Sequence, residues 1–405
     1  MLGPFCFWRL SVFSLAMKII PISTSDALAE FCEKQLKSDY IAVDTEFLRD
    51  RTYWPQLCLV QIAGSDEAAA IDTLAKDIDL APLYELMSNR SLLKVFHAGR
   101  QDVEIFFHRM GSIPEPLFDT QIAAMVCGFG DQVGYETLIS NLVGARIDKS
   151  SRFTDWAHRP LSQKQLTYAL ADVIHLRPAY EKLANKLEES CRTHWLDQEI
   201  DILMDPETYR LDPETSWRRI KSRNKNNRFH AMLRELAAWR EREAQSRDIP
   251  RNRIMRDEAI LEIVAQAPKS IDDLKRMRAV PKGYLLGDKS IDILDAVKRG
   301  RELPEASLPR LEKTKPRPPK IGPVSDLLKV LLKHVTETHD VAPRLIASAD
   351  DLDRIAADDN ADVPALKGWR SELFGEQALA LKAGRIALTA KGSQTKIIKI
   401  EIGKN

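Results

Sequence analysis

The chain has 405 residues, of which 44% are hydrophobic and 29% are charged, and its formal net charge is +1. This length allows two or three domains, and this composition excludes fibrous and wholly disordered chains. The net charge excludes neither an acidic nor a basic partner, so the distribution of charge along the chain is more informative.

Residues 1–16, "MLGPFCFWRLSVFSLA", are apolar with a single arginine. They resemble a secretion signal only superficially, because the start is poor in charge and no clear cleavage motif follows. The segment is also too short to span a bilayer, and no other segment is a membrane candidate. We expect Met17 to be the natural start and residues 1–16 to be a dispensable or mis-annotated extension. A removed targeting segment is the alternative.

Residues 17–205 alternate strand-like and helix-like segments, which predicts an α/β domain. Strands are predicted at 18–22, 40–47, 57–64, 68–74 and 92–99. Helices are predicted at 25–36, with Ser25 as N-cap, and at 81–89, 100–110, 119–129, 135–144 and 162–191. Three consecutive strands followed by strand–helix alternation indicate a mixed sheet with helices on its faces.

The β pattern fades after residue 211, and residues 211–300 are predicted to be a helical domain with a helix restarting at the N-cap Ser270. Residues 301–323 contain six prolines and are predicted to be an extended linker. Residues 324–405 are predicted to be a second helical domain whose weakly alternating tail forms a short hairpin.

Two carboxylates, Asp44 and Glu46, follow the apolar residues 41–43 at the expected end of a strand. Residues i and i+2 of a strand point to the same face, so these side chains should project together. Two like charges so close cost energy unless a cation lies between them. Taken alone, the pattern also fits a solvated strand end or a helix-capping aspartate.

Other candidate residues follow later in the chain. Asp102 falls in the first turn of a predicted helix, where alone it fits a surface acid that complements the helix dipole. Tyr168 and Asp172 are four residues apart and share one helical face, which alone fits a half-buried aromatic beside a solvated acid. Each motif is weak by itself, but their order, DxE, HAGRQD and YxxxD, is specific.

These four acids, with a tyrosine four residues before the last, resemble the catalytic set of the DEDDy exonucleases of the ribonuclease H-like fold. Longer stretches are similar to the ribonuclease D family: "DTEFLRDRTYWPQLCLVQIA", "KVFHAGRQDVEIF", "FDTQIAA" and "DWAHRPLSQKQLTYALADVIHLRPAY". The resemblance covers residues 17–200 and includes every acid and the tyrosine, which implies an intact site.

The resemblance implies a pair of divalent ions, Mg²⁺ or Mn²⁺, and carboxylates supply the hard oxygen ligands that such ions prefer. Asp44 would bridge both ions, while Glu46 and Asp172 would hold the ion that activates water. Asp102 would serve the second ion, and Tyr168 would orient the attacking water. With an unperturbed pKa near 10, Tyr168 is a poor base at neutral pH, which favours the orienting role.

Several polar residues are secondary candidates. His97 either contacts substrate or packs at the end of its strand. Asp119 fits a helix N-cap, and Trp156 and Arg159 fit packing and loop-fixing roles. Further positions that resemble family positions near the nucleotide path are Gln56, Gln61 and Arg100.

A basic segment at residues 217–228 carries six Lys or Arg and no acid. A solvated helix face is one interpretation. Beside an inferred nuclease, however, such a segment contacts phosphates and makes binding fall with salt. We therefore predict RNA contacts from Arg218, Arg219 and Lys221.

The apolar pattern of residues 233–274 resembles the HRDC domain, a helical module shared by RecQ-type helicases and ribonuclease D. Its expected core positions are Leu236, Trp239, Ala244, Pro250, Ile254, Leu261 and Leu274. Residues 324–385 resemble a more divergent second module, with Trp369 in its core. The expected architecture is therefore a mixed-sheet exonuclease core followed by two all-α HRDC-type domains.

The resemblance implies a 3′-5′ exoribonuclease that trims tRNA precursors and other structured RNAs and releases 5′-mononucleotides. Five cysteines at wide spacings without a CxxC motif indicate a reduced, cytoplasmic protein without a zinc site, and we expect a monomer. A 3′-5′ DNA exonuclease is one alternative, although the sequence has no P-loop of a helicase. A catalytically silent RNA-binding scaffold is the other, and the intact acids argue against it.

Overall fold

A computed structural model describes residues 17–285, 287–310 and 321–400 of the chain. The predicted extension at residues 1–16 lies outside the described residues, as do positions 311–320 of the predicted linker. The internal contacts divide the chain into two units. The first consists of Met1–Glu46 and Leu57–Met204, and the second of Phe47–Gln56 and Asp205–Asn405.

A six-stranded sheet forms the core of the first unit. Its strands are β1 (Lys18–Ile22), β2 (Tyr40–Leu48), β3 (Gln56–Ala63), β4 (Glu67–Asp72), β5 (Leu93–Phe96) and β6 (Leu117–Asp119), in the spatial order β1-β4-β3-β2-β5-β6. Strand β4 pairs in parallel with β1 and antiparallel with β3, and β5 pairs in parallel with both β2 and β6. The sheet is therefore mixed, as predicted, and β6 is a strand that the sequence pattern missed.

Most residues of the central strands are apolar because helices cover both faces of the sheet. Every residue of β3 after Gln56 is buried, and Ile41, Ala42 and Val43 of β2 are buried as well. Strand β2 continues through Asp44 and Glu46 to Leu48, so the two acids lie within the strand and not at its end. The predicted strand at 40–47 is confirmed within one residue, but the acids lie before its last residues and not at its end.

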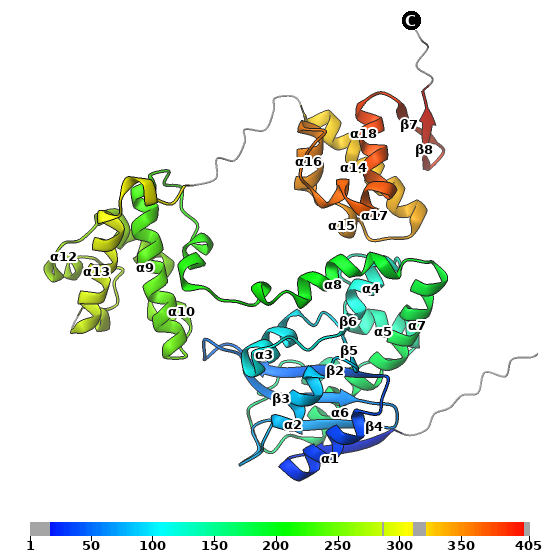
Figure 1. Ribbon diagram of the computed structural model, residues 1–405, viewed down its shortest axis with the longest axis horizontal. Coiled ribbons are helices and arrows are strands. Elements are labelled where there is room, and N and C mark those ends of the chain that lie inside the picture. The colour runs from blue at the N-terminus through cyan, green and yellow to red at the C-terminus, as the bar shows by residue number, and fades with distance from the viewer. Residues whose placement is uncertain (1–16, 286, 311–320, 401–405) are drawn as a thin grey trace, which may run out of the picture. The chain divides into compact units, whose positions relative to one another are not determined.

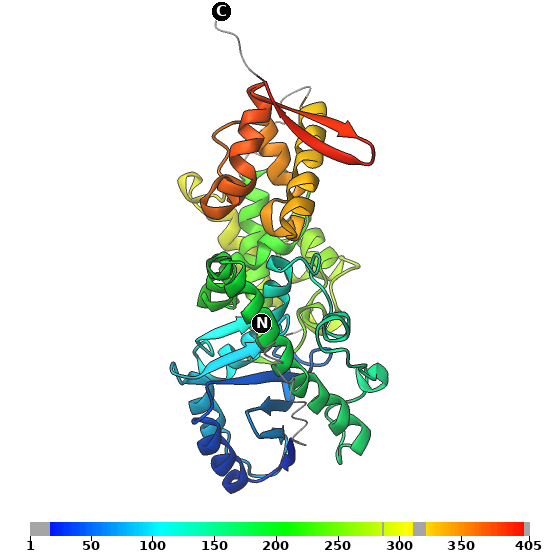
Figure 2. The same cartoon turned by 90° about the vertical axis from the view of Figure 1, so that its right-hand side faces the viewer.

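Helices cover both faces of this sheet. They include α1 (Ser25–Gln35), α2 (Ala81–Ser88), α3 (Arg100–Met110), α4 (Thr120–Val126), α5 (Tyr135–Val143), α6 (Gln163–Ile174), α7 (Leu176–Glu189) and α8 (Asp197–Met204). Helices α1 and α2 lie on one face, and α6 and α7 lie on the other (Figures 1 and 2).

Side-chain caps fix where two of these helices begin. The N-cap of α1 is Thr24, whose hydroxyl accepts a hydrogen bond from the backbone of Ala27, so the predicted cap Ser25 was wrong by one residue. Helix α6 begins with a capping box between Ser162 and Gln165. This cap sets the phase of the helix that carries Tyr168 and Asp172.

The first helical region of the second unit, residues 213–307, has its own apolar core. Its α-helices are α9 (Asn227–Ser246), α10 (Arg251–Ile254), α11 (Asp257–Gln266), α12 (Ile271–Lys275) and α13 (Asp288–Glu302). Of the seven predicted core positions, five are buried, Leu261 packs against the same cluster while partly buried, and Pro250 is half-buried as the N-cap of α10. Helix α12 begins at Ser270 with a capping box, as predicted.

The segment Phe47–Gln56 belongs to the second unit although it connects β2 to β3. The Tyr53 hydroxyl donates a hydrogen bond to Glu241, and the guanidinium of Arg251 lies 5.2 Å from the centre of the Tyr53 ring. The backbone N–H of Trp54 donates to Asp248 over 2.9 Å. The chain therefore passes directly from the strand that carries Glu46 into a segment held by α9 and α10.

The second helical region, residues 322–399, is mostly helical but not all-α. Its elements are α14 (Gly322–His339), α15 (Pro343–Ile346), α16 (Ala349–Ala357), α17 (Gly368–Arg370), a π turn (Ser371–Gly375), α18 (Glu376–Lys382), β7 (Ile386–Lys391) and β8 (Gln394–Lys399). The two strands form the predicted antiparallel hairpin, which lies beside these helices (Figure 2). Trp369 is buried, as predicted. Within the parts of the chain that the structure describes, no helix is long and apolar enough to cross a membrane.

We predict that Gly300→Ala destabilises the first helical region by about 1–3 kcal/mol. A Cβ atom at Gly300 of α13 would lie 2.4 Å from the Met232 Cα atom of α9, so the two helices would have to separate. This cost exceeds the gain of about 1 kcal/mol in helix propensity. Urea unfolding of the full chain measures the effect.

The matched control is Gly283→Ala in the same region, because nothing lies within 4 Å of the added Cβ atom. This variant should stay within about 0.5 kcal/mol of the wild type. A Gly300→Ala variant as stable as the wild type would contradict close packing of α9 against α13.

Candidate active site

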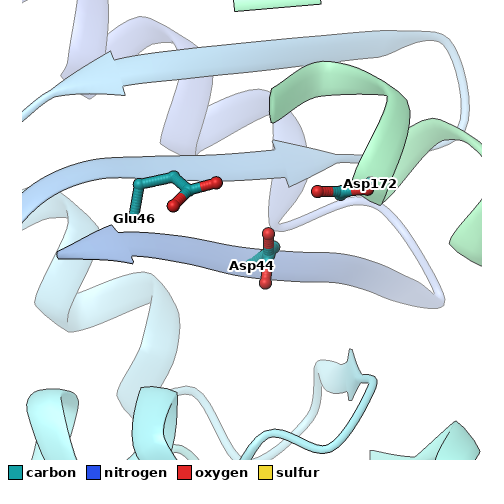
Figure 3. Close-up of side chains that lie close together, drawn as sticks. All are labelled: Asp44, Glu46 and Asp172. Atoms are coloured by element: carbon teal, nitrogen blue, oxygen red, sulfur yellow. The ribbon is translucent and has the colours of Figure 1, made fainter. Parts of the chain in front are cut away.

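Three carboxylates from two distant parts of the sequence converge in the first unit. Asp44 and Glu46 project from β2, and Asp172 projects from α6 (Figure 3). One oxygen atom from each of the three lies within 4.8 Å of the others, and all three side chains are half-buried. The alternation of side chains along β2 places the two strand acids on one face, as predicted.

The three acids destabilise one another's charged forms. Burial and the charge of Asp172 raise the pKa of Asp44 to about 8. Burial and the neighbouring carboxylates, Asp44 first, raise the pKa of Glu46 to about 10. Burial also raises the pKa of Asp172, to about 7, although a hydrogen bond from Tyr168 opposes the shift. Three oxygen donors with unbalanced negative charge fit a hard divalent cation.

The fourth predicted acid, Asp102, lies beside this cluster but outside the group of three. It sits in the first turn of α3, is 8% exposed, and accepts a hydrogen bond from the Thr45 hydroxyl. Burial and the charge of Asp44 raise its pKa well above the usual range. Asp102 is therefore not the surface acid that its position alone would suggest.

Tyr168 adjoins the cluster through its hydroxyl, which donates a hydrogen bond to the Asp172 carboxylate one turn along α6. Burial and the charge of Asp172 raise the pKa of Tyr168 further above its usual value near 10. The Trp156 ring lies 6.1 Å from the Tyr168 ring, centre to centre. Tyr168 is therefore a neutral hydrogen-bond donor at physiological pH.

The turn that leads into α3 is held by the buried carboxylate of Asp119. Its oxygens accept hydrogen bonds from the backbone of Ala98 and Gly99 at 3.1 and 2.8 Å, and they also cap α4 as predicted. Ala98 has a φ of 54°, a left-handed conformation that is uncommon for alanine. Asp119 thereby fixes the backbone three residues before Asp102.

The segment that precedes α6 is held by Arg159, in agreement with the predicted loop-fixing role. Its guanidinium forms two hydrogen bonds of 2.8 and 2.7 Å to the Asp72 carboxylate at the end of β4. It also donates to the carbonyl oxygens of Trp156 and Cys58. These bonds tie residues 156–159 to the sheet.

The predicted substrate contacts of the first unit occupy different environments. His97 is half-buried, with Nδ1 3.0 Å from the Thr120 hydroxyl, and burial lowers its pKa. Arg100, the first residue of α3, is exposed. Gln61 is fully buried in β3, and its place near the nucleotide path stays a prediction. Contacts of His97 and Arg100 with substrate stay predictions.

The predicted contacts of the second unit are exposed. Gln56 lies at the end of the segment Phe47–Gln56. Arg218 and Lys221 are exposed at the end of the 3₁₀ turn Pro213–Arg219 and just after it. Arg219 is 54% exposed and lies 4.0 Å from the buried carboxylate of Glu241.

Sequence reasoning missed three residues near the acids. Thr45, between the two strand acids, bonds Asp102. The Tyr135 hydroxyl donates to the carbonyl oxygens of Ala171 and Asp172 at 3.0 and 2.5 Å. The charge of Arg152 opposes the raised pKa values of Glu46 and Asp172. Of these three residues, only Thr45 could have been identified from the sequence, because it lies inside the DxE motif.

Comparison with known proteins agrees with this geometry. The family model described as 3'-5' exonuclease matches residues 19–188, and the model of the HRDC domain matches residues 229–286. Ribonuclease D of Granulibacter bethesdensis is 50% identical over 378 residues, which cover 93% of this chain and 96% of the relative. Ribonuclease D of Gluconacetobacter diazotrophicus is 50% identical over 377 residues, with the same shares covered.

The crystal structure of Escherichia coli RNase D, described as an exoribonuclease involved in structured RNA processing, is similar with a TM-score of 0.74 and 32% sequence identity. The match covers 91% of this chain and 99% of that one. The similarity therefore extends over both units.

We predict that Asp44→Asn stabilises the metal-free protein by roughly 2–8 °C at pH 8.5. The pKa of Asp44 is about 8 in the folded state and about 4 in the unfolded state. Between about pH 4 and pH 8, therefore, the Asp44 carboxyl binds a proton in the folded state but not in the unfolded state. Stability therefore falls as pH rises through this range, and Asn removes that loss. The midpoints of thermal unfolding of both proteins, measured in chelator at pH 8.5 and pH 5.5, check this prediction.

The gain should shrink at pH 5.5, where Asp44 is protonated and neutral in the folded wild type. Asp66→Asn, an exposed acid between β3 and β4, is the matched control and should change the midpoint little at either pH. An equal gain for Asp44→Asn at both pH values would contradict a raised pKa.

Proposed function

This chain belongs to the ribonuclease D family and is a 3′-5′ exoribonuclease that releases 5′-mononucleotides, and from that premise we propose that it trims the 3′ ends of tRNA precursors and other structured RNAs. The E. coli relative that shares 32% of its sequence acts in structured RNA processing. The observation that carries the proposal is the convergence of Asp44, Glu46 and Asp172 within 4.8 Å.

The activity of this exonuclease family depends on metal ions, and we propose two ions, Mg²⁺ or Mn²⁺, held by Asp44, Glu46, Asp102 and Asp172. Such ions activate a water nucleophile and stabilise the departing 3′ oxygen of a phosphodiester. In this proposal Asp44 would serve both ions, since the charge of Asp172 acts on Asp44 and the charge of Asp44 acts on Asp102. Glu46 and Asp172 would hold the ion that activates water, and Asp102 would hold the other.

Tyr168 has the role of orienting the attacking water. Its hydroxyl already donates to the Asp172 carboxylate, and its raised pKa keeps the proton on the oxygen at neutral pH. A hydroxyl in this state directs a lone pair to a neighbouring water and does not act as the base.

The substrate is held in part by the basic segment at residues 217–228. Arg218, Lys221, Arg223 and Lys225 are exposed there, whereas Arg228 bonds Glu305 and the carbonyl oxygen of Leu303. Exposed charges of one sign attract the RNA backbone without reading its sequence. We also propose that the protein is cytoplasmic, since the cysteines among the described residues are all free, and that it is a monomer.

We predict that Asp44→Asn lowers the rate of mononucleotide release from a labelled tRNA precursor on the order of a thousandfold or more. The wild type should release 5′-mononucleotides with Mg²⁺ or Mn²⁺ and none in chelator. Product analysis at matched enzyme concentrations gives the rates.

Asp66→Asn again serves as the control and should keep wild-type activity. Release by Asp44→Asn at the wild-type rate would overturn the assignment of this cluster. Equal rates of release from a DNA strand of the same sequence would contradict the assignment of RNA as the substrate.

We predict that the triple change Arg218→Gln, Lys221→Gln and Arg223→Gln weakens binding to tRNA about uniformly across sequences. Each phosphate-binding side chain that is removed should reduce the slope of log affinity against log salt by about 1, so the triple variant should reduce it by up to about 3. Binding to catalytically inactive protein carrying Asp44→Asn, measured over a salt series, separates affinity from cleavage.

The matched control removes three exposed charges of the first helical region outside the basic segment: Lys275→Gln, Arg276→Gln and Arg278→Gln. If both triple variants lose affinity and slope equally, residues 217–228 do not form a distinct RNA contact.

A further inference from the structure

Two neighbouring side chains before α6, Arg152 and Phe153, have no role in the chemistry described above. Phe153 is 91% exposed, more than any other large hydrophobic residue among those described. The guanidinium carbon of Arg152 lies 5.3 Å from the centre of the Phe153 ring. A single exposed apolar residue is ordinary on a protein surface, so its surroundings decide what it means.

The backbone around Phe153 is fixed to the helix that carries Tyr168. The Thr154 hydroxyl donates to the carbonyl oxygen of Ser151 at 2.8 Å, and Gln165 of α6 donates to the same hydroxyl at 3.2 Å. Gln165 precedes Tyr168 by three residues, which places both on one face about 5 Å apart along the helix axis. The segment that carries Phe153 is thus held against α6, the helix that carries Tyr168 and Asp172.

Arg152 is the cation of this segment whose charge acts on the acidic cluster. Its charge favours the ionised forms of Glu46 and Asp172, so the guanidinium lies within electrostatic range of both acids. A guanidinium beside the acids attracts an RNA phosphate that the carboxylates alone would repel. Arginine also presents a planar set of donors that matches phosphate oxygens.

We propose that Phe153 and Arg152 form the subsite for the 3′-terminal nucleotide, in which the base stacks on the Phe153 ring and Arg152 contacts a backbone phosphate. The proposal rests on the proposed function of the acidic cluster. Arg152 lies over the ring, and the high exposure of Phe153 leaves ring surface available to a base. Stacking on an aromatic ring accepts every base, as an enzyme that removes successive nucleotides requires.

Two single-stranded RNA oligonucleotides that differ only at the 3′ end test the subsite. One ends in an ordinary nucleotide and the other ends in an abasic ribose. With the ordinary substrate, Phe153→Ala should lower kcat/KM for release of the first nucleotide about fivefold to a hundredfold. With the abasic substrate the same variant should lose less than about twofold, because no base remains to stack. Phe153→Trp should retain the wild-type preference for the base.

Two further variants separate the effects of charge and of exposed apolar area. Arg152→Gln should lower kcat/KM on both substrates by a similar factor and reduce its salt dependence, since a phosphate contact does not involve the base. Ile19→Ala removes a 55% exposed apolar side chain from β1 of the same unit and should act like the wild type on both.

Each outcome has a distinct meaning. An equal loss for Phe153→Ala on the two substrates, or no loss on either, overturns the stacking role. An unchanged salt dependence of Arg152→Gln overturns the phosphate contact. Failure of the proposed function would appear instead as release by Asp44→Asn, whatever Phe153 does.

Discussion

The unfavourable proximity of like charges is the constraint on which this protein depends. Asp44, Glu46 and Asp172 hold their oxygens within 4.8 Å, and each carboxyl is driven toward its neutral form. A fold tolerates such a cluster only where the surrounding structure overdetermines it, and function explains why it is kept. The apolar residues 41–43 of β2 supply that surrounding structure by anchoring the strand in the middle of the sheet.

Polar contacts away from the acids complete this scaffold. Asp119 holds the backbone before α3, and Arg159 holds the segment before α6 against Asp72. Both groups bond backbone atoms, so they hold the segments that lead into α3 and α6, the helices of Asp102 and Tyr168. Buried charged groups that are fully hydrogen-bonded rigidify their surroundings, which is what a site with closely spaced ligands requires.

The second unit contributes exposed positive charges for RNA binding, whereas the first unit carries the acidic site. Its first helical region packs α9 against α13 through Gly300 and leaves the charges of residues 217–228 largely exposed. Without bound ions the carboxylates of the first unit repel RNA, whereas exposed lysines and arginines of the second unit attract the phosphate backbone. The segment Phe47–Gln56, bound to α9 and α10 through Tyr53, joins the strand of Glu46 directly to this unit.

The sequence by itself determined the residue types and their local geometry. The period of two in β2 put Asp44 and Glu46 on one face, the period of 3.6 in α6 put Tyr168 and Asp172 on one face, and the capping boxes at Ser162 and Ser270 are local patterns. Only the tertiary structure decided that Asp102 is buried beside Thr45 rather than solvated, that Gln61 is enclosed in the sheet, and that the charge of Arg152 acts on the acids. The physical reason is that periodicity fixes which side chains share a face of one element. Burial and charge proximity depend on which elements meet, and no local pattern encodes that.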